Sequence, residues 1–190
     1  MKKDILIICL IVLLIIFVVN GTEIQSVEEY YLTHIDDIKE DSETVFISIR
    51  CDSVYSNYDM LDEALKEDGI LPKDGIILEK GEYVLREGDT VFDILSRVTR
   101  HKKIQMEYQG ADRNGFGSVH IEGISYLYSF SCGPLSGWTY TVNGEVASVG
   151  CSLYELSDGD VIEWIYTCDF AESLTDAPGS TEMGGKTNES

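Results

Sequence analysis

Hydrophobic and polar residues alternate along several short segments between residues 45 and 167. The first segment, VFISIR at 45–50, places Val45, Ile47 and Ile49 on one face of a strand. Similar short patterns predict further strands at 76–79, 82–86, 104–108, 126–131, 138–143 and 161–167. The pair Asn143-Gly144 predicts a tight hairpin, because a type I′ turn requires positive φ at both central residues.

One helix is predicted, beginning after Gly88, with Asp89 or Thr90 as its N-cap. Its apolar stripe has helical periodicity and consists of Val91, Phe92, Leu95 and Val98. Five basic residues crowd its C-terminal end: Arg97, Arg100, His101, Lys102 and Lys103. Favourable interaction with the helix dipole explains this cluster, and a patch that binds a ligand is the alternative.

Residues 52–75 carry turn signals at Asp68-Gly69 and Asp74-Gly75, so we predict a long loop there with a short helix near 61–65. A single helix among several strands, without repeated β-α-β alternation, predicts an α+β fold. The compact domain is expected at 45–169. Residues 22–44 are expected to form an acidic spacer and residues 170–190 a disordered polar tail.

A continuous apolar run, Ile5–Val19, follows Lys2 and Lys3 at the N-terminus. As a helix it would reach about 22 Å, which is short of the roughly 30 Å hydrocarbon core of a bilayer. Residues 1–21 are therefore predicted to be either a cleaved signal peptide or an uncleaved N-terminal membrane anchor. Both alternatives place the rest of the chain on the extracellular side, anchored or secreted, because the early positive charges precede the run.

The formal net charge is −20; residues 1–21 carry +1 from Lys2, Lys3 and Asp4, so residues 22–190 carry −21. Binding of nucleic acid or anionic lipid requires clustered Lys and Arg, so neither is expected as a partner, and membrane contact is expected only through the N-terminal segment. Solubility outside the cell explains the acidity, and calcium binding is the alternative. The nearest approach to a calcium loop, Asp112-Arg-Asn-Gly115, lacks the later carboxylates and is predicted to be a turn, so no metal site is expected.

Four cysteines lie in the predicted domain: Cys51, Cys132, Cys151 and Cys168. Four cysteines in an exported domain indicate two disulfides, and three connectivities are open. A zinc site is the alternative, but the chain has no C-x-x-C motif, and its histidines are scattered. Disulfides are therefore the preferred interpretation.

Three segments carry a family resemblance: EGDTVFDIL at 87–95, LSGWTYTVNG at 135–144 and DGDVIEWIYT at 158–167. Together with the order of the predicted elements, they resemble a bacterial domain-of-unknown-function family that is similar to the C-terminal domain of transcobalamin and intrinsic factor. The resemblance implies a β-grasp with one main helix, related to soluble-ligand-binding domains. In that topology the first and last strands run parallel, side by side.

The implied topology also suggests how the cysteines pair. Cys51 and Cys168 stand at the ends of the first and last strands, so they would lie close together. Cys132 precedes the hairpin and Cys151 follows it, so the returning chain would bring these two together. The resemblance therefore implies the disulfides Cys51–Cys168 and Cys132–Cys151.

The resemblance further implies a corrinoid ligand such as cobalamin, with no covalently required cofactor. In transcobalamin and intrinsic factor a large helical domain also holds the ligand. No such domain is expected in this sequence, so binding by the domain alone would be weak or would need a partner such as a transporter of the envelope.

Seven aromatic residues fall at alternate positions of the predicted strands: Tyr126, Tyr128, Phe130, Trp138, Tyr140, Trp164 and Tyr166. A ligand-stacking platform is one interpretation. Burial of most of these rings beneath the helix is preferred, with Trp138 the expected exception because it borders a glycine-rich loop. Loops at one end of the sheet offer better ligand contacts, and ordinary turns are the alternative. The candidate ligand-binding residues are Phe116, Pro134, Leu135, Ser136, Trp138 and Glu145.

Catalysis has little support, because the sequence has no nucleophile elbow and no recognisable Ser/His/Asp set. Asp158 and Asp160 look like paired carboxylates, but the first belongs to a turn and the second opens a strand. The expected function is an extracellular, non-enzymatic ligand-binding module. A cell-surface adhesion or protein-interaction module of the envelope is the alternative, and a purely structural envelope domain is a third possibility.

Overall fold

The structure is a computed structural model that describes residues 38–115 and 117–170. All of these residues belong to Ile35–Ser190, one of the two units into which the chain divides. The predicted leader or anchor at 1–21, most of the predicted spacer at 22–44 and most of the predicted tail at 170–190 lie outside the described residues. Within the described ranges, no helix has the length and apolar character needed to cross a membrane.

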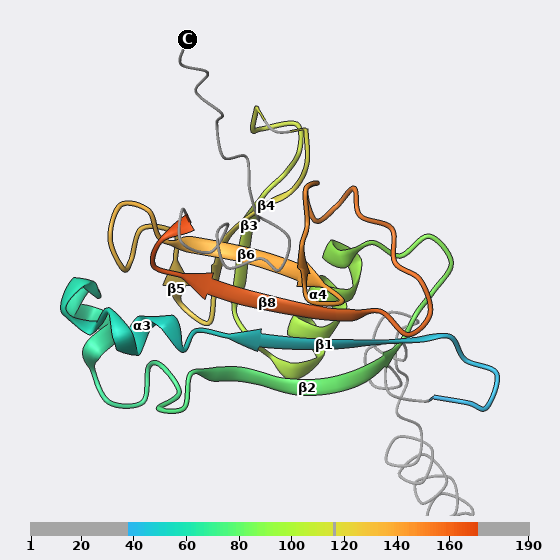
Figure 1. Cartoon of the computed structure of the whole chain (residues 1–190), viewed down its shortest axis with the longest axis horizontal. Coiled ribbons are helices and arrows are strands. Elements are labelled where there is room, and N and C mark those ends of the chain that lie inside the picture. Colours follow the sequence, from blue (N-terminus) through green and yellow to red (C-terminus); the bar gives the residue numbers. More distant parts are fainter. Residues whose placement is uncertain (1–37, 116, 171–190) are drawn as a thin grey trace, which may run out of the picture. The chain divides into compact units, whose positions relative to one another are not determined.

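The described residues form a mixed α and β structure that is mostly sheet with few helices (Figure 1). The strands are β1 (Thr44–Arg50), β2 (Ile76–Val84), β3 (Met106–Gln109), β4 (His120–Ile124), β5 (Leu127–Tyr128), β6 (Gly137–Val142), β7 (Glu145–Val146) and β8 (Val161–Thr167). The helical segments are α3 (Ser53–Ser56), η1 (Tyr58–Met60), η2 (Glu63–Lys66) and α4 (Val91–Lys102). The predicted combination of one main helix with several strands is confirmed.

Five strands form one sheet in the order β2-β1-β8-β6-β7, and β3, β4 and β5 form a second sheet. β1 and β8 are parallel neighbours, with Phe46 opposite Val161 and Arg50 opposite Ile165. The predicted parallel pairing of the first and last strands is thereby confirmed. The turn between β6 and β7 also has the predicted geometry, since φ is 55° at Asn143 and 81° at Gly144.

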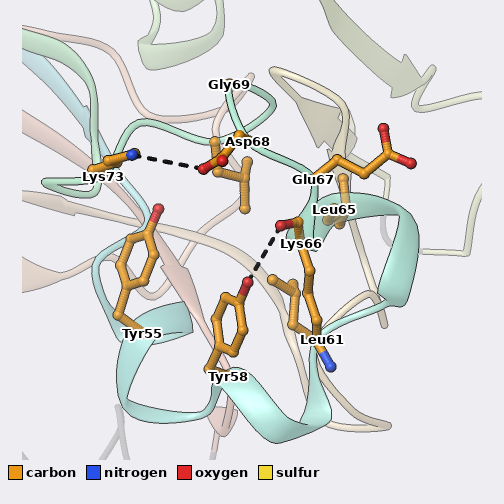
Figure 2. Close-up of a pocket in the computed structure, with 10 residues that line it drawn as sticks. Tyr55, Tyr58, Leu61, Leu65, Lys66, Glu67, Asp68, Gly69 and Lys73 are labelled. Carbon is orange, nitrogen blue, oxygen red and sulfur yellow. Dashed lines mark hydrogen bonds and ion pairs between the residues drawn. The ribbon is translucent and has the colours of Figure 1, made fainter.

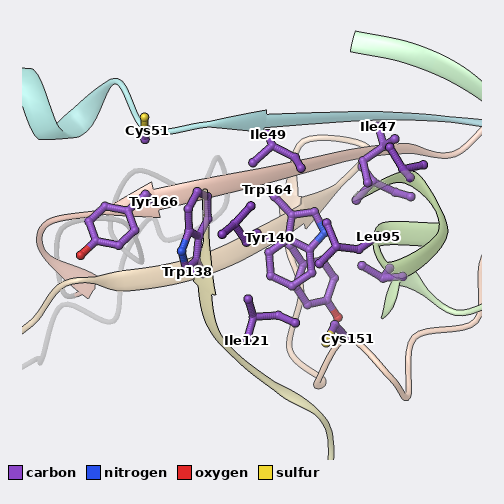
Figure 3. Close-up of a cluster of buried hydrophobic side chains, with 14 of the residues drawn as sticks. Ile47, Ile49, Cys51, Leu95, Ile121, Trp138, Tyr140, Cys151, Trp164 and Tyr166 are labelled. Carbon is purple, nitrogen blue, oxygen red and sulfur yellow. The ribbon is translucent and has the colours of Figure 1, made fainter. Parts of the chain in front are cut away.

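Aromatic side chains of β6 and β8 face one another across the strands and form the centre of the core (Figure 3). The cross-strand pairs are Trp138 with Tyr166 and Tyr140 with Trp164. Leu95 of α4 and Ile121 of β4 join the same buried cluster (Figure 3). The helix therefore covers the aromatic face, as predicted, and the second sheet, which was not predicted, covers it as well.

Trp138 was expected to be the exposed exception, and this expectation is wrong, because its side chain is 6% exposed. Its ring packs edge-to-face against Tyr166, with the ring centroids 5.3 Å apart. Its indole Nε1 donates a hydrogen bond to the Leu127 carbonyl at 2.8 Å, so the one polar atom of the ring is satisfied within the core.

Most of the seven aromatic rings were predicted to be buried, but Tyr126 and Phe130 are 61% and 69% exposed. The predicted strand 126–131 is reduced to the two residues of β5. The reason is the backbone, because φ is positive at Ser125, Tyr126 and Phe130, and a strand cannot continue through that conformation. The sequence analysis also missed β4, and it divided β2 into two strands at 76–79 and 82–86.

Thr90 is the N-cap of α4. Its hydroxyl accepts from Asp93 N at 3.3 Å, and the Asp93 carboxylate accepts from Thr90 N at 2.9 Å, which forms a capping box. Asp89, the other predicted cap, instead binds Arg97, with its two carboxylate oxygens 2.7 and 2.6 Å from the two guanidinium Nη atoms. Arg97 therefore fastens the helix to the loop before it rather than balancing the helix dipole.

All four cysteines of the predicted domain are buried and free, so the structure contains neither Cys51–Cys168 nor Cys132–Cys151 as a disulfide. It instead brings Cys168 Sγ to 2.8 Å from Cys132 Sγ. The chain that returns from the hairpin follows β6 only as far as Ala147 and then turns towards α4, which carries Cys151 away from that pair.

Candidate ligand-binding groove

An open groove of about 490 Å³ lies between the loop that precedes β2 and the turns that follow α4 and β4. Its lining combines aliphatic side chains with two lysines, a glutamine and an exposed tyrosine. The polar members are Lys73, Lys103, Gln105, Ser125 and Tyr126, and we call this site the Lys73–Lys103 groove. Volumes of roughly 300–1,000 Å³ with an apolar lining and a few polar groups are typical of small-molecule sites.

Three residues at this groove have left-handed backbone conformations: Lys103 with φ 56°, Ser125 with φ 52° and Tyr126 with φ 64°. Ser125 and Tyr126 form the two-residue turn between β4 and β5, a position that strongly favours Asn-Gly. A left-handed non-glycine residue costs roughly 1–2 kcal/mol. Such strain gathers at functional sites, and here it presents Tyr126 to the groove.

Gln105 holds this strained turn in place. Its backbone carbonyl accepts from Ser125 N at 2.8 Å, and its side-chain Oε1 accepts from Tyr126 N at 2.7 Å. Its Nε2 donates to Tyr128 Oη at 3.0 Å, and Tyr128 Oη donates to Glu107 Oε1 at 2.7 Å. The hydrogen bond to Glu107 raises the pKa of the Tyr128 hydroxyl, so the hydroxyl remains a donor. This side of the groove is therefore preorganised for binding.

A second pocket of about 260 Å³ adjoins the groove and shares Gly69, Leu71 and Lys73 with it. Figure 2 shows Tyr55 and Tyr58 side by side in this tyrosine pocket. Their rings are stacked, with centroids 6.4 Å apart and an interplanar angle of 13°. Tyr55 Oη donates to the Pro72 carbonyl at 2.7 Å, which ties α3 to the shared wall of the two cavities.

Lysines gather at these two cavities although the chain is strongly acidic. Lys66 forms an ion pair with Glu63 at 2.7 Å and lies over the Tyr58 ring. Lys73 Nζ lies 3.6 Å from Asp68 Oδ1, and both side chains are almost fully exposed, so this ion pair is weak. Lys103 adds a second positive charge to the groove. An anionic group of a ligand would therefore meet two ammonium groups here.

The structure does not gather the predicted ligand-binding residues into one site. Pro134 and Leu135 are exposed in the loop before β6, whereas Glu145 is exposed in β7, at the other end of β6. A strand of this length separates its ends by roughly 17 Å. Phe116 lies outside the described residues. A ligand-binding role for these residues remains a prediction.

The other two predicted residues, Ser136 and Trp138, are buried. Ser136 Oγ donates to the Gly133 carbonyl at 2.8 Å and accepts from Cys132 N and Tyr166 Oη, both at 3.0 Å. Through these hydrogen bonds the Ser136 hydroxyl holds the loop before β6 against β8. In the structure as it stands, Ser136 supports the fold rather than facing a ligand.

The carboxylates of Asp158 and Asp160 are engaged in local structure. Asp158 Oδ1 accepts from Thr44 N at 2.7 Å, and the Asp160 carboxylate accepts from Ser157 N and Asn143 Nδ2, both at 2.8 Å. They close the turn and open β8, in agreement with the sequence analysis. Within 38–115 and 117–170, no group of three or more His, Cys, Asp or Glu side chains is arranged to hold a metal ion.

Residues 88–167 match a family model described as "Domain of unknown function (DUF4430)". The predicted resemblance to a domain-of-unknown-function family is confirmed. The segment similar to DUF4430 runs from the loop before α4 to the end of β8. It includes Lys103, Gln105 and Tyr126, whereas the groove residues 69–77 lie outside it. No curated protein matches the sequence significantly.

Two solved structures are similar to the chain. Haptocorrin in complex with Cbi is 10% identical, with a TM-score of 0.43, over 68% of this chain and 26% of the haptocorrin chain. A protein from Ruminococcus gnavus ATCC 29149, provisionally described as metal-binding, is 12% identical, with a TM-score of 0.37, over 66% of this chain and 96% of that chain. The match thus spans about a quarter of haptocorrin.

The sequence analysis assigned none of the groove to a ligand, although it weighed a ligand patch at the basic end of the helix. Lys103 belongs to that patch and does line the groove. Ser125-Tyr126 was a second signal, because it fills a tight turn without Asn or Gly. Neither signal reveals residues 69–77, which only the tertiary fold brings alongside.

Proposed function

We propose that the described region is a non-enzymatic module that binds a small amphipathic ligand with an anionic group in the Lys73–Lys103 groove. The observation that carries the proposal is the joint presence of an aliphatic lining, the exposed Tyr126 and two lysines in one groove of about 490 Å³. Ammonium groups favour a phosphate or carboxylate, and the aliphatic and aromatic surface favours an apolar body.

A corrinoid such as cobalamin is the ligand class that the family resemblance implies, and its chemistry is compatible with the groove. Its flat macrocycle would rest against Tyr126, and the phosphate of its nucleotide arm would meet Lys73 and Lys103. The groove is too small to enclose a whole corrinoid. The ligand would therefore extend towards the tyrosine pocket, and a partner such as an envelope transporter would cover its outer face.

We further propose a β-grasp fold and an extracellular location, anchored by residues 1–21 or secreted. The parallel pairing of β1 with β8 around one main helix supports the fold assignment. The apolar run Ile5–Val19 behind two lysines supports the location. An extracellular location would give an external ligand access to the groove.

The test is titration of the full-length chain, purified in mild detergent, with cobalamin. Calorimetry measures the affinity, and absorbance after a desalting column measures retained ligand. The double variant Lys73→Gln/Lys103→Gln is expected to weaken binding at least about 10-fold, because a charge-assisted hydrogen bond contributes about 1.5 kcal/mol or more.

The matched control is Lys39→Gln/Lys80→Gln, which removes the same charge from exposed positions outside the groove. It should bind like the unaltered chain. Protein that leaves the column colourless and releases no heat would exclude a corrinoid. Equal weakening in the two double variants would show that net charge, rather than the groove, governs binding.

A protein-interaction or adhesion role is the second candidate, because apolar side chains are exposed near the loop before β6. Met60, Phe130 and Leu135 are 51%, 69% and 53% exposed. A Cβ on Gly133 would lie 3.5 Å from Met60 Sδ, so the loop and η1 adjoin. Exposed apolar clusters commonly mark interaction sites. The test is a pull-down from envelope extracts with the unaltered chain and with Leu135→Asp. If both chains recover the same envelope protein equally well, this surface is not the interaction site.

A further inference from the structure

Two of the buried cysteines meet at the end of β8. Cys132 lies before β6 and Cys168 directly after β8, and Cys168 Sγ is 2.8 Å from Cys132 Sγ. A disulfide bond is about 2.05 Å long, so a small movement of either side chain would complete it. Their exposed fractions are 0% for Cys132 and 6% for Cys168, which leaves the pair enclosed by protein.

We propose that Cys132 and Cys168 are joined by a disulfide in the oxidised protein, while Cys51 and Cys151 remain thiols. The bond fastens the loop before β6 to the end of β8. It replaces both pairings that the family resemblance implied. The inference rests on the cysteine geometry alone and is independent of the proposed ligand-binding function.

The loop before β6 is already held in the position that the bond requires. Ser136 Oγ accepts from Cys132 N and from Tyr166 Oη, each at 3.0 Å. Tyr166 lies on β8 two residues before Cys168, so one hydroxyl links the backbone of the first cysteine to the strand that carries the second. These noncovalent contacts hold the two sulfur atoms next to each other in the folded chain.

The register of the parallel strands disfavours Cys51 as the partner of Cys168. Arg50 lies opposite Ile165, which places Cys51 across from Tyr166. Two residues of strand measure about 6.6 Å, and neighbouring strands lie about 4.8 Å apart, so an ideal ladder separates the Cα atoms of Cys51 and Cys168 by about 8 Å. Disulfides require a Cα separation of about 7 Å or less.

Cys151 is held elsewhere. Its Sγ donates to the Val119 carbonyl at 3.4 Å, and its own carbonyl accepts from Phe92 N of α4 at 3.0 Å. Figure 3 shows Cys51 and Cys151 at opposite sides of the drawn core cluster, so these two do not pair with each other. Both remain as buried thiols when Cys132 and Cys168 are bonded.

Formation of the bond removes two protons and two electrons from the two thiols. A disulfide oxidant such as oxidised glutathione accepts them by thiol–disulfide exchange and leaves as two thiols. Burial, followed by the hydrogen bond with Cys168, raises the pKa of the Cys132 thiol to about 12. Its reactive thiolate is therefore scarce in the folded protein, and oxidation is expected while the chain folds rather than afterwards.

The experiment is refolding of the reduced full-length chain in a mixture of reduced and oxidised glutathione, followed by alkylation of the remaining thiols. Peptide mapping by mass spectrometry should then find Cys132 linked to Cys168, with Cys51 and Cys151 alkylated. A Cys51–Cys168 link, a Cys132–Cys151 link or alkylation of all four cysteines of the domain would overturn the proposal.

Thermal unfolding gives an independent measurement. Closing the segment between Cys132 and Cys168 should raise the Tm of the oxidised chain above that of the reduced chain by about 10 °C. Cys132→Ser and Cys168→Ser should abolish this difference, whereas Cys151→Ser should retain it. A difference that survives in Cys132→Ser, or that disappears in Cys151→Ser, would contradict the assigned pair.

Discussion

Replacing Arg97 with Met should show how much the ion pair with Asp89 contributes to the attachment of α4. The two side chains are joined by two hydrogen bonds of 2.7 and 2.6 Å, and Arg97 Nη2 also donates to the Val84 carbonyl at 3.0 Å. The Asp89 side chain is 10% exposed and that of Arg97 18%. Removal of Arg97 therefore leaves a carboxylate that is almost buried and has lost its counterion.

Arg97→Met is expected to lower the free energy of unfolding by about 3 kcal/mol, the low end of the roughly 3–5 kcal/mol found when one partner of a buried ion pair is removed. The low end applies because Asp89 keeps a hydrogen bond from Arg86 N at 2.8 Å. Arg97→Lys retains the charge but loses the forked geometry, so it should fall between Arg97→Met and the unaltered chain.

Urea unfolding followed by tryptophan fluorescence is a suitable assay, because both tryptophans, Trp138 and Trp164, are buried in the core. With a denaturant slope of about 2 kcal/mol per molar, the expected loss moves the midpoint by about 1.5 M. Arg50→Met is the matched control, since Arg50 pairs with Asp52 at 3.0 Å, with side chains 46% and 49% exposed. It should cost about 1 kcal/mol or less. Equal shifts for the two variants would refute the reasoning.

Two further stability predictions use the same assay. Thr141 Oγ1 is buried without a hydrogen-bond partner, so Thr141→Val should raise the free energy of unfolding by about 1 kcal/mol. Thr139→Val, at a half-buried position on the same strand, should have little effect. A loss of stability in Thr141→Val would contradict this prediction. Gly75 has φ 72°, and an added Cβ would lie 2.6 Å from Asp52 Cα, so Gly75→Ala should cost at least about 1 kcal/mol more than Gly88→Ala, which has φ 76° and open space around it. Equal costs for the two glycine variants would show that the close approach to Asp52 is absent.

Elements that depend on local sequence could be predicted. The start of the helix, with Thr90 as one of two capping candidates, follows from side chains within one turn of each other, and the Asn143-Gly144 turn follows from the backbone freedom of two residues. The parallel pairing of the first and last strands came instead from the family resemblance, because nothing local to β1 or β8 specifies a partner so distant along the chain.

Elements that depend on an unusual backbone could not be predicted. Tyr126 and Phe130 alternate with polar residues as a buried strand would, yet their positive φ ends β5 after two residues. Pairing of Asp89 with Arg97 was likewise hidden, because both residues had a simpler local explanation at the two ends of the helix.

The cysteines show most clearly why pattern alone was insufficient. The topology correctly placed Cys51 and Cys168 just after the ends of neighbouring strands, but pairing depends on register, and a two-residue offset is enough to exceed the reach of a disulfide. Cys132 follows no strand pattern, and the hydrogen bonds of Ser136 decide where it lies. The groove poses the same problem, since Lys73 and Lys103 come from separate loops and only the folded chain sets them around one cavity. The proposed binding site therefore depends on which loops meet, and that is fixed by contacts between distant segments rather than by any single stretch of sequence.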